Sequence, residues 1–260
     1  MKKTLFPVGV LLLLVSLTGC GGNKILKEPQ SIELQGPLVT ASDSRLAVAF
    51  DWVIVRDGPG TWSKNADWDE YLFRLHNLSG NEITIESIVI FDSMEMMIVS
   101  SSSRKQLIRG SKAAVKRYKE DGLQVKAGLG GMGLIAASGA TVAAGAAVLA
   151  GGAALTSAAA GAAVVGAVVV APVLAVGGVF RGVNNSKVST EIENRSTDLP
   201  VTIGTNQEVA LNAFFPISPS PVRMEINYSD ADDSYVLTID TSEVLGGLHL
   251  TAPEQEVKSE

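Results

Sequence analysis

The sequence has few residues of the kinds that build metal centres or catalytic sites. It contains one cysteine, Cys20, and two histidines, His76 and His249, which lie far apart in the chain. A single cysteine excludes an intramolecular disulfide and a cysteine-based metal cluster. Two distant histidines give little support to a zinc site. We therefore expect no metal, no cofactor and no catalytic residue, and we expect no nucleic-acid partner.

Charge is missing altogether from residues 127–180. This stretch consists mostly of Gly, Ala and Val and holds no Asp, Glu, Lys, Arg or His. A helix of about 20 residues spans ~30 Å of hydrocarbon, so the stretch is long enough for two helices and a turn near Gly151. Small residues recur at every fourth position, from Gly139 and again from Ala154. Such spacing lets helices approach closely, and the stretch resembles the glycine-zipper hairpins of bacterial envelope proteins.

Aromatic residues make up only 5% of the chain, and residues 127–180 contain neither Trp nor Tyr. The aromatic belt that marks the two interfaces of many membrane spans is therefore absent from this stretch. Two interpretations of the expected hairpin stay open. The hairpin associates with a membrane, or it is buried inside a soluble assembly.

The amino end has the layout of a secretory signal peptide, with Lys2 and Lys3 followed by an apolar run. The run ends in Leu-Thr-Gly-Cys at residues 17–20. This motif resembles the lipobox of Gram-negative bacterial lipoproteins. The resemblance implies a signal peptide over residues 1–19 and acylation of Cys20 after cleavage. Gly21, where an Asp would favour retention at the inner membrane, implies the outer membrane.

Residues 20–44 are polar and interrupted by proline, and we expect a lipidated tether of limited order. Residues 45–102 then alternate apolar and polar side chains in short runs separated by turn signals. This pattern predicts antiparallel strands. We expect them at residues 46–55, 71–78, 82–91 and 94–99.

Trp62 and Trp68 flank an acidic stretch that includes Asp67, Asp69 and Glu70. One hypothesis is a loop that binds sugar or peptidoglycan, in which the indoles stack and the carboxylates accept hydrogen bonds. The simpler interpretation is that each Trp anchors the loop on the core. A calcium site is a third alternative, although the regular ligand spacing of known calcium loops is missing.

Residues 103–126 are basic and predict a helix. Lys112, Lys116 and Lys119 recur at spacings of four and three, which places them on one helical face. A cationic face of this kind can rest on anionic lipid headgroups. The alternative is a solvated face without a partner.

Residues 181–250 return to a strand-like pattern, with strands expected at 187–194, 208–214, 222–228 and 235–239. The run Asp230-Ala231-Asp232-Asp233 predicts a hairpin turn and could also bind a cation. Residues 251–260 form a polar tail. Each half offers too few strands for a comfortable separate domain. We expect a mainly β fold with one antiparallel β-sandwich, Ig-like in outline, that carries the basic helix and the 127–180 hairpin as an insertion.

These patterns favour a non-enzymatic lipoprotein of the cell envelope, anchored in the outer membrane and facing the periplasm. Its partners would be membrane lipid, reached through acylated Cys20 and the 127–180 hairpin, and a second copy of the chain or another envelope protein. The hairpin would mediate membrane association or self-assembly, and the sandwich would act as an interaction module. An oligomeric pore or secretion-system component is an alternative. A cell-wall enzyme that uses Asp67, Asp69 or Glu70 is a further one.

Overall fold

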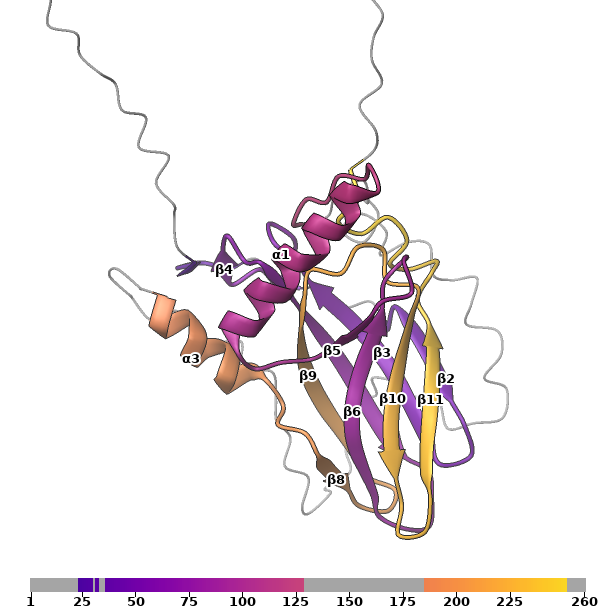
Figure 1. The fold of residues 1–260 in the computed structure, drawn as a ribbon. Coiled ribbons are helices and arrows are strands. Elements are labelled where there is room, and N and C mark those ends of the chain that lie inside the picture. The colour runs from indigo at the N-terminus through magenta and orange to yellow at the C-terminus, as the bar shows by residue number, and fades with distance from the viewer. Residues whose placement is uncertain (1–22, 30, 33–35, 129–184, 252–260) are drawn as a thin grey trace, which may run out of the picture.

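The computed structural model describes residues 23–29, 31–32, 36–128 and 185–251. They form a mainly β structure of antiparallel sheets with two helices, α1 and α3 (Figure 1). Cys20 and residues 129–180 of the expected hairpin lie outside the described residues, as do the signal peptide and most of the polar tail.

The first sheet has four strands in the order β2-β3-β5-β9, and all neighbours run antiparallel. Its strands are β2 (Val39–Ser42), β3 (Leu46–Ile54), β5 (Trp68–Asn77) and β9 (Glu208–Pro216). The strands expected at 46–55, 71–78 and 208–214 are confirmed. The strand β9 continues through Pro216, where its last residue pairs with Trp68.

The second sheet has the order β11-β10-β6-β7, and β8 pairs with β6 beside this path. Its strands are β6 (Ile83–Phe91), β7 (Met97–Val99), β8 (Val201–Ile203), β10 (Arg223–Ser229) and β11 (Ser234–Asp240). The strands expected at 82–91, 222–228 and 235–239 are confirmed, whereas the strand expected at 94–99 begins only at Met97. The residues before it form a turn, in which the Asp92 carboxylate accepts the backbone N–H groups of Met94 and Met96.

One hydrophobic cluster joins the inner faces of the two sheets. Phe50, Phe73 and Phe215 enter it from the first sheet, and Ile88 and Ile226 enter it from the second. Inward side chains alternate with outward ones in the regular parts of the strands, as the pleat of a strand requires. The alternation is interrupted where the register shifts, between Phe50 and Val53 of β3 and between Ile85 and Ile88 of β6. Burial of these apolar side chains is the main force that holds the sheets together.

Both sheets combine strands from before and after residues 129–184. In the first sheet β5 pairs with β9, and in the second sheet β6 pairs with β10. A third, two-stranded sheet pairs β1 (Lys24–Ile25) with β4 (Ser63–Lys64). The described residues on either side of 129–184 therefore belong to the same two sheets.

The helix expected at 103–126 is confirmed as α1 (Arg104–Glu120), but it ends earlier than expected. Gly122 adopts a left-handed φ of 77° and donates its N–H to the carbonyl of Lys119. The N–H of Leu123 reaches back to the carbonyl of Tyr118. These two bonds form a Schellman motif, which closes a helix with a glycine that has no Cβ to clash.

The strand expected at 187–194 is wrong, because this segment forms the helix α3 (Asn185–Arg195). Val188 and Ile192 are its two buried side chains. A spacing of four residues puts two side chains on one face of a strand and also on one face of a helix. Both side chains contact the cluster that surrounds Trp62, and this packing selects the helix.

The expectation that residues 20–44 form a tether of limited order is also wrong for part of that range. Residues 24–25 form β1, and β2 is an edge strand of the first sheet. Leu38, Val39 and Ala41 pack against the core between the sheets. Buried apolar contacts and strand pairing therefore order this part of the chain, despite its proline residues.

Candidate functional site

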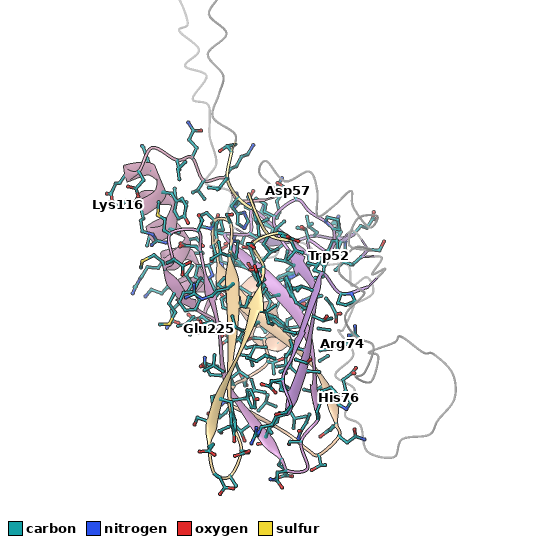
Figure 2. The ribbon with its side chains drawn as sticks, turned by 90° about the vertical axis from the view of Figure 1, so that its right-hand side faces the viewer. Trp52, Asp57, Arg74, His76, Lys116 and Glu225 are labelled. Atoms are coloured by element: carbon teal, nitrogen blue, oxygen red, sulfur yellow. The ribbon has the colours of Figure 1, made fainter. Side chains whose placement is uncertain are left out.

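The two helices cover one end of the sheets, which we call the helix-covered end. It consists of loop residues 55–67, α1, α3, β1 and β4. The opposite end, called the turn end, consists of turn residues 78–82, 204–207 and 230–233. Figure 2 shows Asp57 and Lys116 toward the helix-covered end and His76 toward the turn end. Most residues singled out in the sequence lie at the helix-covered end.

Trp62 and Trp68 are buried, and they form a second hydrophobic cluster outside the two sheets. Their ring centroids lie 6.2 Å apart, and Phe214 meets Trp62 edge to face at 6.4 Å. Leu107 of α1 and the two buried residues of α3, Val188 and Ile192, pack in the same cluster. Both Trp side chains are buried, as the anchor interpretation expected, but they pack in this second cluster and not on the core between the sheets. They anchor the helices onto the outer face of the first sheet, so their faces are covered.

Glu70 is a buried carboxylate in the wall of this cluster. It accepts the indole N–H of Trp62 at 2.7 Å and the side-chain amide N–H of Asn212 at 3.1 Å. Arg195 of α3 lies 3.8 Å from the carboxylate and 4.9 Å from the centroid of the Trp62 ring. Burial raises the pKa of Glu70 above its ordinary value, while the charge of Arg195 opposes that shift. Glu70 thus connects α3 to both β5 and β9.

Asp69 points to the other side of β5, and its carboxylate contacts His249 at 2.7 Å. Both side chains are fully buried. The backbone N–H of Gly128 donates to Nδ1 of His249 at 3.2 Å, so the ring proton sits on Nε2 and is donated to Asp69. The second oxygen of Asp69 has no hydrogen-bond partner among the described residues, and neither has the hydroxyl of Tyr71. Burial and the nearby charge of Asp69 raise the pKa of the Tyr71 hydroxyl well above its ordinary value.

Asp67, the third carboxylate of the acidic stretch, lies closer to the surface. It pairs with Arg56, whose Nε also donates to the carbonyl of Ala66 at 2.7 Å. The backbone carbonyl of Asp67 accepts the hydroxyl of Ser111 in α1 at 2.5 Å. The structure therefore places the three carboxylates in three separate environments and does not bring them together around one cleft.

Three segments that are far apart in the sequence lie around loop 55–67 and the Trp62 cluster, namely Asn23, Gly128 and helix α3. The side-chain amide of Asn23 donates to the carbonyl of Asn65, and its oxygen accepts from Arg104 of α1 at 2.9 Å. Gly128 lies against Arg56, and a Cβ at this glycine would come within 2.9 Å of the Arg56 carbonyl oxygen. Helix α3, which begins at Asn185, packs on the Trp62 cluster. Chain on both sides of 129–184 therefore meets the body at the helix-covered end.

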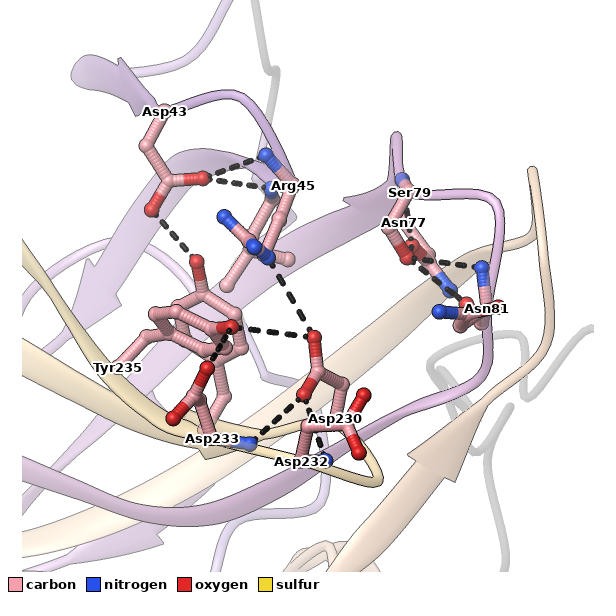
Figure 3. A network of polar contacts seen from close by, with 11 residues as sticks. Asp43, Arg45, Asn77, Ser79, Asn81, Asp230, Asp232, Asp233 and Tyr235 are labelled. Atoms are coloured by element: carbon pink, nitrogen blue, oxygen red, sulfur yellow. Dashed lines mark hydrogen bonds and ion pairs between the residues drawn. The ribbon is translucent and has the colours of Figure 1, made fainter.

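The acidic run at residues 230–233 forms the turn between β10 and β11, as predicted. Asp230 accepts the backbone N–H groups of Asp232 and Asp233, and it also contacts Arg45 and Tyr235 (Figure 3). The hydrogen bonds from the turn backbone lower the pKa of Asp230. This carboxylate therefore has partners within and beside the turn, which account for an acidic residue at this position.

Within the described part of the chain, no group of His, Cys, Asp and Glu side chains has the arrangement of a metal site. A cavity of about 10 Å³ lies beside Trp62 and Glu70, which is about the space of one water molecule. Neither helix of the described residues has the length and apolar character needed to cross a bilayer.

Sequence reasoning missed His249 and Arg195 as partners of the acidic stretch. His249 lies 180 residues from Asp69, and Arg195 lies in a segment that was expected to be a strand. The spacing of Asp69 and Glu70 offered one usable signal, because adjacent strand residues point to opposite faces. That rule separates the two carboxylates, but it does not identify the partner of either.

No protein-family model, no curated protein and no solved structure matches this chain.

Proposed function

We propose that the protein is a non-enzymatic, lipid-anchored component of the bacterial cell envelope. In this proposal Cys20 carries the acyl chains, residues 127–180 form an apolar helical hairpin, and the outer membrane holds the protein on its periplasmic side. The two sheets act as one β-sandwich, Ig-like in outline, which carries α1 and the hairpin as an insertion and serves as an interaction module.

The observation that carries this proposal is the convergence at loop 55–67. Asn23, which follows Cys20 by three residues, and Gly128, the second residue of the apolar stretch, both contact this loop. A lipid on Cys20 and a hairpin in the same membrane must leave the body on the same side. One acyl chain alone gives only marginal binding, whereas several chains or a chain with a second membrane element give stable anchoring. The shared exit makes a two-part anchor geometrically feasible.

The shared core supports the interpretation of a single module with an insertion. Strands from before and after 129–184 pair directly, as β5 does with β9. A hairpin inserted between them needs entry and exit points on one side of the module. Gly128 next to Arg56, and α3 on the Trp62 cluster, satisfy that requirement.

The first test is membrane fractionation of the wild type beside Cys20→Ser, followed by an alkaline carbonate wash. We expect the wild type in the membrane pellet after the wash. Retention of Cys20→Ser would identify 127–180 as an integral membrane element, and its release would make the lipid the sole anchor. A wild type that stays in the soluble fraction would overturn the proposal.

A further inference from the structure

The solvent-exposed face of α1 carries a row of positively charged side chains. Lys105, Arg109, Lys112, Lys116 and Lys119 are all exposed, and they follow one another at spacings of four and three residues. At 100° per residue, these five side chains fall within an arc of about 80° and along about 21 Å of helix. We call them the cationic stripe. Figure 2 shows Lys116 on the side of α1 that faces away from the sheets.

The body of the protein fixes the direction of the cationic stripe. The buried side chains of α1 are Leu107, Ser111, Ala114 and Tyr118, and they occupy the opposite face of the helix. The hydroxyl of Ser111 accepts the backbone N–H of Ile217 at 2.8 Å. The hydroxyl of Tyr118 bonds Ser93 at 2.9 Å. These contacts to two separate segments prevent α1 from rotating about its own axis.

The helix separates its structural cations from those of the stripe. Arg104 is bonded to Asn23, and Arg117 pairs with Asp92 at 2.6 Å. In the stripe, only Lys116 has an ion pair with another described residue, the contact at 3.8 Å with Glu120, and both of these side chains are largely exposed. Such an exposed pair contributes little and is easily replaced. The remaining four cations make no ion pair with another described residue, so their charge is available to a partner.

We propose that the cationic stripe docks on the anionic phospholipid headgroups of the membrane that holds the protein, an inference that rests on the proposed function. Rows of four to eight Lys and Arg beside a membrane segment are typical of lipid-binding surfaces. The stripe is straight and one-sided, which fits a plane of phosphates. Four of its five cations are lysines, whose compact charges suit mobile headgroups, whereas the fixed fork of arginine suits a single carboxylate.

The position of α1 supports the same partner. The first turn of α1 is bonded to Asn23, which follows Cys20 by three residues in the sequence, and Gly128 follows the last residue of α1 by eight positions. Two apolar side chains are exposed nearby: Val115 lies beside the stripe on α1, and Leu123 follows the end of the helix. Cations together with a few exposed aliphatic side chains match the boundary between headgroups and acyl chains.

The test uses the lipidated full-length chain reconstituted in vesicles. Because Cys20 is the only native cysteine and is acylated, Ala113→Cys on α1 and Ala231→Cys at the turn end each supply one free thiol for a fluorophore. Quenching by spin-labelled headgroup lipids is compared in phosphatidylcholine vesicles with and without phosphatidylglycerol. We expect quenching at position 113 to exceed that at position 231 several-fold, and to depend on phosphatidylglycerol.

A charge variant and its matched control then isolate the stripe. The double variant Lys112→Gln with Lys116→Gln should reduce the equilibrium constant for docking of α1 on the vesicle surface by about 30-fold. Each cation near an anionic surface raises that constant roughly fivefold. Val236→Glu with Ala210→Glu alters the net charge by the same amount at exposed strand positions of the body, and it should leave quenching at position 113 unchanged.

Equal quenching at positions 113 and 231 would overturn lipid docking. Quenching at position 113 that is the same with and without phosphatidylglycerol would also overturn it. Changes at position 113 that require added envelope proteins would also overturn it and assign the stripe to an acidic protein partner. Flotation of the vesicles separates this result from a failure of the proposed function. A protein that floats with vesicles but shows no quenching at α1 refutes docking alone, whereas a protein that does not float refutes the anchor.

Discussion

The two sheets differ on their outer faces. In the second sheet β10 and β11 alternate regularly between buried and more exposed side chains, as expected for a sheet with one face in water. In the first sheet, residues 68–71 of β5 are buried without interruption, and alternation returns only beyond them. The uninterrupted part lies under α1 and α3, which cover the outer face there. The burial pattern along a strand thus shows whether one or both faces of the sheet are covered at that point.

The covered part of the first sheet also holds two buried carboxylates. Asp69 and Glu70 point to opposite faces of β5, and each has found a partner on a distant segment. Buried carboxylates are costly unless they are hydrogen-bonded. Both ends hold buried polar contacts. At the helix-covered end the buried groups are carboxylates, whereas at the turn end the buried side-chain amide of Asn77 donates to the carbonyls of Asn81, Ile203 and Gly204.

The largest expected effect is that of His249→Ala. This substitution leaves the Asp69 carboxylate buried without its partner and removes the acceptor of the Gly128 N–H. We expect a loss of about 4 kcal/mol in the free energy of unfolding, measured by urea denaturation. His76→Ala at the exposed turn end serves as the control and should change stability by less than about 0.5 kcal/mol. Equal losses in the two variants would contradict the contrast between the ends.

Leu107→Ala tests the apolar part of the covered end. Leu107 is fully buried between α1 and the Trp62 cluster. Truncation of such a side chain leaves a cavity and should cost about 3 kcal/mol. Val115→Ala removes an aliphatic side chain from the exposed face of the same helix and should be close to neutral. A neutral Leu107→Ala in the same urea titration would mean that α1 does not need this contact.

Glu70→Ala should cost about 2–3 kcal/mol, because it leaves the indole N–H of buried Trp62 without an acceptor. Differential scanning calorimetry measures the loss. Glu225→Ala on the open second sheet is the matched control, since this carboxylate pairs with Arg223 near the surface. We expect a much smaller change there. A result in the reverse order would show that the open sheet is the more dependent on polar contacts.

The smallest expected effect is the contribution of Glu70 ionisation to the pH dependence of the free energy of unfolding. Its folded pKa is raised above the ordinary value of 4.5, so the folded state binds the proton more tightly than the unfolded state. The stability that this difference provides is fully present below pH 4.5 and is lost as the pH rises through the folded pKa. Wild type should therefore gain stability relative to Glu70→Gln as the pH is lowered from 7 toward 4.5. A constant difference between them in urea titrations over that range would refute the raised pKa.

Most of the strands could be predicted from the sequence because their apolar side chains repeat with a period of two. Residues 223–229 are a clear case, since Met224, Ile226 and Tyr228 all pack in the shared core. In residues 46–54 the period of two holds only as far as Phe50, because the register shifts between Phe50 and Trp52 and brings Val53, not Ile54, into the core. Helix α3 could not be predicted in this way. Val188 and Ile192 fit either period, and only the cluster at Trp62 decides between them. Tertiary contacts therefore overrode a local pattern that was ambiguous.

The candidate site was harder to predict than the strands. The sequence indicated that Trp62, Trp68 and the adjacent carboxylates form one group, and they do lie at one end of the body. Their partners, His249 and Arg195, come from the far side of residues 129–184. Nothing in a single sequence relates positions that far apart. The cationic stripe was partly visible in the spacing of its lysines, because helix periodicity is a local property.

The interleaving of strands from both sides of 129–184 sets an order for assembly during synthesis. Strands β5 and β6 are made early, but their neighbours β9 and β10 are made only after the apolar stretch. Until then, each of these two strands exposes an edge of unpaired N–H and C=O groups, which can pair with another chain. A growing chain that has not reached residue 208 cannot complete either sheet. Nascent copies of this protein therefore need protection of those edges until the last quarter of the chain has emerged.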